Sequence, residues 1–120
     1  MIGENIGLCM HPEFLAEGTA ISDFMNPDRI VIGACDSKTL KIVQQLYTPF
    51  DNKDMILTTP ATAEMIKYTA NAFLATVISY ANEIANLCEK TGVNVEEVSI
   101  GMGLDKRIGS RFLRAGPAYG

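Results

Sequence analysis

Apolar residues in the first half of the chain gather into short continuous runs, a pattern typical of strands buried within a sheet. Three runs are clear, at residues 6–10, 29–34 and 55–58. The first ends at His11-Pro12 and the second follows Asn26-Pro27-Asp28, which are turn-forming sequences. The pattern therefore predicts three short strands.

A helical pattern separates the second run from the third. Its apolar residues recur at helical spacing: Leu40, Val43, Leu46 and Tyr47. Asp36 or Ser37 can cap its start, and Pro49 should end it. Strands that alternate with a helix predict part of an α/β sheet rather than a stack of hairpins.

One long helix is expected from residue 59 onward. Thr59-Pro60 suits a helix start, Glu64 suits the helix dipole there, and Gly92 after Lys90 suits its end. Such a helix has about 30 residues and is about 45 Å long. Its sides are slim because alanine recurs along it, at Ala70, Ala72, Ala75, Ala81 and Ala85. Packing against a partner subunit and packing within one domain both fit this composition.

A second helix should begin at Asn94, with Glu97 three residues later in a capping-box arrangement, and end near Gly101 or Gly103. The sequence from Gly101 begins like a dinucleotide-binding glycine loop. It follows a helix rather than a strand, so we interpret it as a helix end and a turn.

Composition restricts the functional class. Of the 120 residues, 48% are hydrophobic and 20% charged, which is typical of a globular chain, and the net charge of −4 argues against nucleic-acid binding. Neither a membrane-spanning run of about 20 apolar residues nor a signal peptide is present. We expect a soluble, cytoplasmic protein that binds neither membrane nor nucleic acid.

The cysteines and the single histidine predict no metal site. Cys9, Cys35 and Cys88 lack metal-ligand spacing and are expected to be reduced, buried thiols. His11 alone cannot form a histidine-based zinc site.

Three groups of polar residues are candidates for chemistry. Glu13 and Glu17 follow a strand end, where α/β sheets bind ligands, and fit either a general base or a solvated loop. Lys67 and Asn71 lie four apart on one helix face, and fit either an oxyanion site or a lysine reaching solvent. The arginines near the C-terminus fit either phosphate binding or a solvated surface: Arg107, Arg111 and Arg114.

Taken together, these segments resemble the UDP-glucose/GDP-mannose dehydrogenase family. The resemblance is carried by residues 11–21 (HPEFLAEGTAI), 26–33 (NPDRIVIG), 64–75 (EMIKYTANAFLA) and 103–109 (GLDKRIG). It favours the UDP-glucose branch. It implies that residues 1–58 are the last strands of a Rossmann-like NAD-binding domain. Residues 59–120 would then be an all-α central domain that forms a homodimer through the long helix.

The resemblance also implies an activity. Such enzymes oxidise the C6 alcohol of UDP-glucose to the carboxylate of UDP-glucuronate, a precursor in polysaccharide biosynthesis, through a cysteine thioester and with two NAD. Glu17 matches a catalytic position close to the cofactor, and Lys67 and Asn71 match the oxyanion pair. The matched substrate contacts are Glu13, Phe14, Leu15, Ala16, Arg107, Phe112, Arg114, Tyr119 and Gly120. Arg107 would reach the sugar site of the other subunit.

Some features depart from the family pattern. The glycine fingerprint and the nucleophilic cysteine are absent, so we expect an incomplete piece that is inactive alone. His11 replaces an asparagine, Val77 a basic residue and Ala118 a glycine. Two alternatives are a non-enzymatic helical dimerisation module and a relative that oxidises another UDP-sugar.

Overall fold

The computed structural model describes residues 5–50 and 54–117. By its internal contacts the chain divides into two compact units, Met1–Thr69 and Ala70–Gly120, which we describe separately. Helix α3 (Pro60–Thr91) contributes residues to both units. The domain boundary expected after residue 58 stays a prediction.

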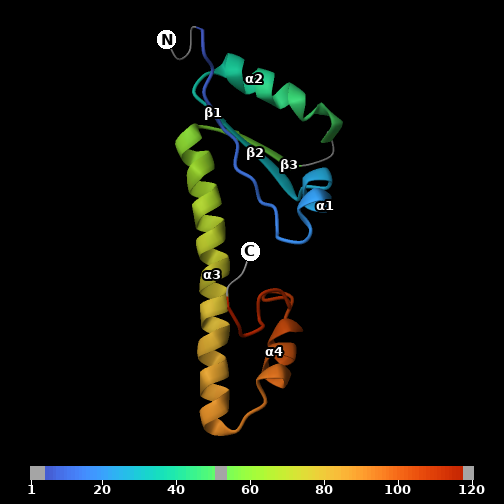
Figure 1. Ribbon diagram of the computed structural model, residues 1–120, viewed down its shortest axis with the longest axis vertical. Helices are drawn as coiled ribbons and strands as arrows, with labels where there is room; N and C mark the ends of the chain where they lie inside the picture. The colour runs from blue at the N-terminus through green and yellow to red at the C-terminus, as the bar shows by residue number, and fades with distance from the viewer. Residues whose placement is uncertain (1–4, 51–53, 118–120) are drawn as a thin grey trace. The chain divides into compact units, whose positions relative to one another are not determined.

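A three-stranded sheet forms the centre of the first unit (Figure 1). Its order is β1 (Cys9–Met10), β2 (Arg29–Ala34) and β3 (Asp54–Thr58). β2 and β3 are parallel, with Ile30 opposite Met55, and α2 (Ser37–Leu46) connects them. The predicted α/β arrangement is therefore confirmed for this unit.

β1 differs from the first expected strand. It is antiparallel to β2, with Cys9 opposite Ala34, and only two residues long instead of the five predicted at 6–10. Ile6 and Leu8 are 64% and 48% exposed. Ile6 forms only an isolated β-bridge and Leu8 O accepts a hydrogen bond from Cys35 N at 3.1 Å, so the rest of the run follows the sheet edge without lengthening β1.

The core of the first unit lies on β2 and reaches the start of α3. Val31 and Ile32 are fully buried, as is Ala63 in α3. Gly33 permits the close approach, since a Cβ added there would lie 2.5 Å from Thr59 O and 2.7 Å from the Ala63 Cβ. This packing fixes the first turns of α3 beside the sheet.

Two helix starts follow the sequence closely. Asp36 caps α2 by accepting a hydrogen bond from Thr39 N at 2.8 Å, and α2 ends before the 3-10 turn η1 (Thr48–Phe50) that contains Pro49. Thr59 caps α3, with its Oγ1 accepting from Thr62 N at 3.3 Å and its carbonyl from Ala63 N at 3.0 Å.

The end of α3 also agrees with the prediction. Gly92 has a φ of 70°, and Val93 N donates to Cys88 O at 3.0 Å, which closes the helix in a Schellman motif.

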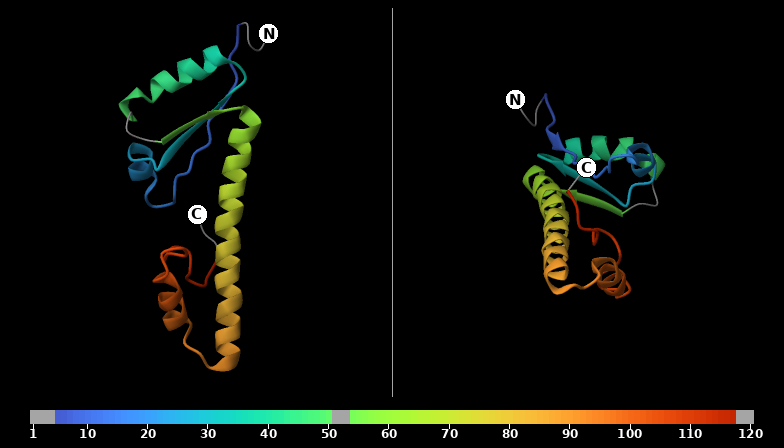
Figure 2. Two further views of the ribbon diagram at one scale, coloured as in Figure 1. Left: turned by 180° about the vertical axis from the view of Figure 1, so that it is seen from behind. Right: turned by 60° about the horizontal axis from the view of Figure 1, so that its bottom comes forward.

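The second unit packs the later turns of α3 beside α4 (Val95–Gly103), as Figures 1 and 2 both show. Its buried side chains are Ala81, Cys88 and Leu113. Asn94 caps α4 as expected, but its side chain accepts from Glu96 N at 2.9 Å, and no capping-box bond from Glu97 occurs among the described residues. Gly101 and Gly103 lie in the last turn of α4, so the expected helix end is confirmed.

Sequence analysis missed one helix and misjudged two cysteines, since Cys9 is only partly buried. Helix α1 (Ala20–Met25) has apolar residues at helical spacing, Ile21, Phe24 and Met25, but it is only six residues long and buries none of them. Cys88 is buried, but Cys35 is exposed because it follows the last residue of β2. All three cysteines are free.

Two features are absent from the described residues. No helix among residues 5–50 and 54–117 is long and apolar enough to cross a membrane. The same residues contain no cluster of three or more His, Cys, Asp or Glu side chains that could hold a metal ion.

Candidate functional site

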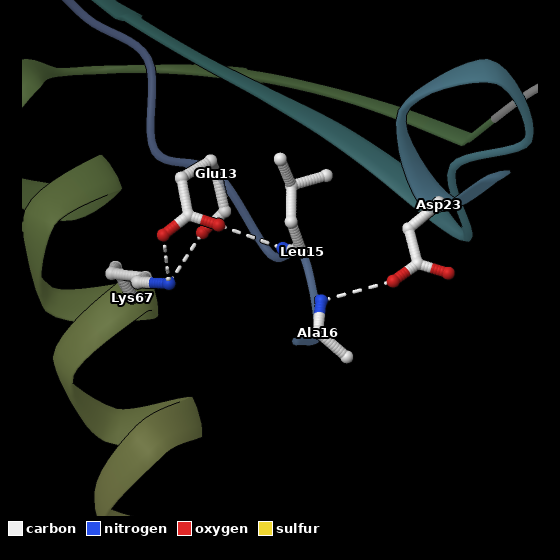
Figure 3. A network of polar contacts seen from close by, with 5 residues as sticks. All are labelled: Glu13, Leu15, Ala16, Asp23 and Lys67. Atoms are coloured by element: carbon white, nitrogen blue, oxygen red, sulfur yellow. Dashed lines mark hydrogen bonds and ion pairs between the residues drawn. The ribbon is translucent and has the colours of Figure 1, made fainter. Parts of the chain in front are cut away.

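The candidate site in the first unit is built on the loop that follows β1. Pro12 is buried and anchors the loop against the unit. The Glu13 carboxylate then folds back, and its Oε2 accepts a hydrogen bond from Leu15 N at 2.7 Å (Figure 3). This bond lowers the pKa of Glu13, and the hydrogen bond from Lys67 lowers it further. Glu13 is therefore held as a carboxylate.

Lys67 of α3 holds this loop from the other side (Figure 3). Its Nζ donates to Glu13 Oε1 at 2.9 Å and to the Glu13 carbonyl oxygen at 2.5 Å. The Lys67 side chain is 21% exposed, so it does not extend freely into solvent. The structure thus brings together two residues that are 54 positions apart in the sequence.

Phe14 lies beside two cations. The Arg29 guanidinium carbon is 3.8 Å from the centre of the Phe14 ring, and Lys67 Nζ is 5.5 Å from it. Cations in this range are attracted to the face of an aromatic ring. Arg29 is the first residue of β2, so the strand start fixes the ring orientation. Sequence analysis did not single out Arg29 as a site residue.

Asp23 of α1 is a second carboxylate that shapes the loop (Figure 3). Its Oδ2 accepts hydrogen bonds from Ala16 N at 2.9 Å and from Thr19 Oγ1 at 2.8 Å. The bond from Ala16 is the main cause of a lowered pKa for Asp23. Sequence analysis missed this residue, although the spacing of Thr19 and Asp23 was an available signal.

These contacts decide which backbone groups of the loop remain available. The N–H groups of Leu15 and Ala16 are both committed to carboxylates. Within residues 5–50 and 54–117, the carbonyl oxygens of Phe14 and Leu15 accept no hydrogen bond. The loop can therefore accept hydrogen bonds from a ligand, which suits hydroxyl groups.

His11 fixes the start of the loop. Its Nδ1 lies 2.6 Å from Val31 O and its Nε2 2.5 Å from the Tyr47 hydroxyl. Because a carbonyl only accepts, Nδ1 carries a proton and donates to Val31 O, and Nε2 shares a hydrogen bond with the Tyr47 hydroxyl. Burial raises the pKa of Tyr47, with the nearby Cys9 thiol adding to the effect, so its hydroxyl stays protonated. The histidine that departs from the family pattern thus connects β2 with the end of α2.

Glu17 and Asn71 are less constrained. Glu17 is exposed beside Gly18, which has a φ of 85°, and its carboxylate forms no hydrogen bond with the described residues. Asn71 lies one helical turn after Lys67 in α3 and is exposed. Their catalytic assignments stay predictions.

The candidates in the second unit belong to the segment after α4. Arg107 forms a local ion pair with Asp105, with Nη2 2.6 Å from Oδ2, while its side chain stays 88% exposed. This pair is the main cause of a lowered pKa for Asp105. Arg111 and Arg114 are exposed and form no ion pair within the described residues. Tyr119 and Gly120 lie outside the described residues.

The loop at residues 112–117 is held by side chains of both helices in the second unit. Ser99 Oγ donates to Leu113 O at 3.0 Å, and the Asn82 amide forms two hydrogen bonds with Gly116. Phe112 has a φ of 64°, a left-handed conformation that is unfavourable for a phenylalanine. Sequence analysis missed both Asn82 and Ser99.

A cavity of about 280 Å³ lies elsewhere in the first unit. Its lining is mostly polar and comes from α2, the following turn and β3: Lys41, Gln44, Gln45, Tyr47, Thr48 and Met55. None of the predicted site residues lines it. The candidate chemistry is therefore carried by the two loops.

Comparison with family models covers nearly the whole chain. Residues 2–51 match the model of the UDP-glucose/GDP-mannose dehydrogenase family, NAD binding domain. Residues 61–120 match the model of the same family's central domain.

Two curated relatives are similar to nearly the whole chain. The chain is 53% identical over 116 residues to the UDP-glucose 6-dehydrogenase YwqF of Bacillus subtilis, covering 97% of this chain and 26% of that protein. It is 47% identical over 118 residues to the UDP-glucose 6-dehydrogenase of Rickettsia conorii, covering 98% and 27%. The chain thus spans about a quarter of the length of these curated relatives.

Solved structures are similar as well. A UDP-glucose dehydrogenase from Pyrobaculum islandicum superimposes with a TM-score of 0.86 at 43% identity, covering 92% of this chain and 25% of that one. The GDP-mannose dehydrogenase of Pseudomonas aeruginosa gives a TM-score of 0.77 at 37% identity, covering 93% and 26%.

Proposed function

The chain belongs to the UDP-glucose/GDP-mannose dehydrogenase family, and from that premise we propose that it forms part of an NAD-dependent UDP-glucose 6-dehydrogenase. The complete enzyme would oxidise the C6 alcohol of UDP-glucose to a carboxylate and use two NAD per turnover. The two UDP-glucose 6-dehydrogenases compared above support this substrate.

One observation carries the proposal, namely the double contact of Lys67 with Glu13. An ammonium has three N–H donors, and Lys67 uses two of them on the Glu13 carboxylate and carbonyl. The third donor can bind an oxygen that becomes negatively charged during the reaction, as an oxyanion site requires. We assign this role to Lys67, with the amide of Asn71 as its neighbour on the helix.

The loop after β1 would bind the sugar. Its acceptors without a partner among the described residues include the carbonyl oxygens of Phe14 and Leu15, and the hydroxyl groups of glucose are donors that match them. Ala16 contributes by holding the loop shape through Asp23. Glu17 would position the water or act as the base in the hydrolytic step, because its carboxylate stays free among the described residues.

NAD would accept hydride when it is bound. The parallel pair β2 and β3, joined by α2, fits the open sheet of a dinucleotide-binding domain. Glu17 is the residue of this chain that we place close to the cofactor.

Dimerisation through α3 is a further part of the proposal. Large apolar side chains are exposed along this helix: Met65, Tyr68, Phe73, Tyr80 and Leu87. Exposed apolar residues on a helix favour a partner surface. Within residues 5–50 and 54–117 Arg107 is paired only with the nearby Asp105, and we assign it to the sugar site of the neighbouring subunit. The same exposed residues support a non-enzymatic dimerisation module as the second candidate.

A hybrid enzyme tests the proposal. The chain replaces its matching segment in the Bacillus subtilis relative, and NADH formation is followed with UDP-glucose, GDP-mannose or a UDP-N-acetylhexosamine. We expect two NADH per UDP-glucose and much slower reaction with the other sugars. The 120-residue chain alone should be inactive because it spans about a quarter of its relatives.

Each outcome of this test is decisive. A folded hybrid that oxidises another nucleotide sugar faster would contradict the substrate assignment. A folded hybrid without any dehydrogenase activity would favour the dimerisation module.

A further inference from the structure

We propose that Asn82 is a positioning residue that holds the loop at residues 112–117 in the conformation that binds the nucleotide part of the substrate. This inference rests on the proposed function and extends it, because Asn82 lies on α3 and is not among the residues matched to the substrate.

Asn82 binds one residue of the loop in two directions. Its Nδ2 donates to Gly116 O at 3.0 Å, and its Oδ1 accepts from Gly116 N at 2.8 Å. Both bonds are partly buried, and they span 34 positions of sequence. A primary amide is suited to this pair of bonds because it carries both a donor and an acceptor, which a carboxylate does not.

A second bond holds the other end of the loop. Leu113 is buried, and its carbonyl accepts from Ser99 Oγ at 3.0 Å. No helix or strand hydrogen bonds support residues 112–117, so these side chains define the loop conformation. The left-handed backbone at Phe112 is strained, so we expect the loop to change conformation if one of these hydrogen bonds is lost.

Arg114 connects this anchoring to ligand binding. It lies between the two anchored positions and is exposed, without an ion-pair partner among the described residues. A guanidinium recognises phosphate through paired, directional bonds, so its backbone must be fixed in advance. Asn82 does not touch the reacting atoms in this proposal. Its loss should therefore weaken substrate binding and leave the chemical step unchanged.

The test compares two identical chemical changes on the same helix. Asn82→Asp keeps the size of the side chain but replaces the donor that Gly116 O requires by a carboxylate oxygen. Asn86→Asp makes the same change one turn later, at an exposed residue whose side chain forms no hydrogen bond with the described residues. Ser99→Ala removes the second anchor without introducing a charge.

Two measurements are needed. Hydrogen exchange of the Gly116 amide in the 120-residue chain should become about tenfold faster in Asn82→Ala, which removes the acceptor of that N–H, and stay unchanged in Asn86→Ala. In the hybrid enzyme, Asn82→Asp should raise the KM for UDP-glucose about tenfold, whereas kcat and the KM for NAD stay within about twofold. Ser99→Ala should change the KM for UDP-glucose in the same direction, and it serves as the test if Asn82→Asp does not fold.

The inference and the proposed function fail in different ways. An active wild-type hybrid whose KM for UDP-glucose is unaffected by Asn82→Asp and Ser99→Ala overturns the inference alone. An equal loss in kcat and in affinity for NAD also overturns it, because that pattern indicates general destabilisation. A wild-type hybrid that does not oxidise UDP-glucose overturns the proposed function and this role of the loop together.

Discussion

Lys67 Nζ lies 2.5 Å from the carbonyl oxygen of Glu13 and 2.9 Å from its carboxylate, so one ammonium group binds both the backbone and the side chain of a single residue. The contact joins α3 to the loop after β1. It orients the ammonium group and also fixes the backbone that carries Phe14 and Leu15.

Replacing Lys67 should lower turnover more than it weakens substrate binding, although the same side chain also holds the loop assigned to the sugar. In the hybrid enzyme we expect Lys67→Ala to reduce kcat by at least about a hundredfold, with a much smaller change in the KM for UDP-glucose. Loss of one oxyanion donor raises the barrier by about 3 kcal/mol in well-studied enzymes. Lys90→Ala, at an exposed position of the same helix, is the control. An unchanged kcat for Lys67→Ala would return Lys67 to an ordinary surface lysine.

Asp23 should make the loop sensitive to acid. Its pKa is lowered in the folded chain from an ordinary value of 3.8, mainly by the Ala16 N–H. A carboxylate with a lowered pKa contributes stability that is fully present above the unfolded pKa and lost as the pH falls through the folded pKa. We therefore expect the Ala16 amide resonance in an NMR titration to shift with a midpoint below 3.8.

Two variants test whether the Asp23 carboxylate causes the shift of the Ala16 resonance. Asp23→Asn should abolish the shift of the Ala16 resonance. Asp28→Asn, at an exposed residue that follows α1 in the sequence, should preserve it. An Ala16 resonance that titrates identically in Asp23→Asn would disprove the contact.

Replacing Gly33 or Gly101 by alanine should change the free energy of unfolding in opposite directions. Gly33→Ala forces a methyl group against Thr59 O and Ala63, so it should lower the free energy of unfolding by about 1–3 kcal/mol. Gly101→Ala adds a methyl group within α4 where no atom lies within 4 Å. It should raise the free energy of unfolding by about 0.5–1 kcal/mol, because alanine favours helices. Urea unfolding of both variants measures the difference, and equal midpoints would contradict the packing of β2 against α3.

The chain should form a dimer in solution through α3. Burial contributes about 25 cal/mol for each Å² of apolar surface, and Tyr68 and Phe73 are 72% and 66% exposed. Sedimentation equilibrium over a range of concentrations should give the mass of two chains. Phe73→Asp should shift the equilibrium toward monomer, whereas Glu83→Gln at another exposed position should not. A monomer mass at every concentration would contradict the dimer and the role assigned to Arg107.

Local signals in the sequence located most of the secondary structure. Thr59-Pro60 and Gly92 mark both ends of α3 because capping depends on residues close to the helix ends. The limits of β1 could not be predicted in this way, since they depend on which residues of β2 are available as partners. Helix α1 was missed because its six residues are too few for the helical spacing of Ile21, Phe24 and Met25 to stand out.

The candidate site residues also fall into two groups, those found from the sequence and those found only in the structure. Glu13 and Lys67 were found through their motifs, and the structure shows that they touch. The structure alone revealed three further residues. Arg29 contacts the ring of Phe14, Asp23 accepts from the backbone of Ala16, and Asn82 binds the backbone of Gly116. Such contacts need a three-dimensional arrangement, which residue spacing alone does not provide.

The hydrogen bonds of the loop after β1 have a consequence for how the family can diversify. Phe14 and Leu15 offer their carbonyl oxygens, which every amino acid possesses. Under the proposed function, a substitution of Leu15 would leave these acceptors for the sugar hydroxyls in place. The two carboxylates that orient the backbone, Glu13 and Asp23, have no such freedom. Under the proposed function, the choice of sugar would therefore depend on the carboxylates that orient this backbone as well as on the groups that touch the sugar.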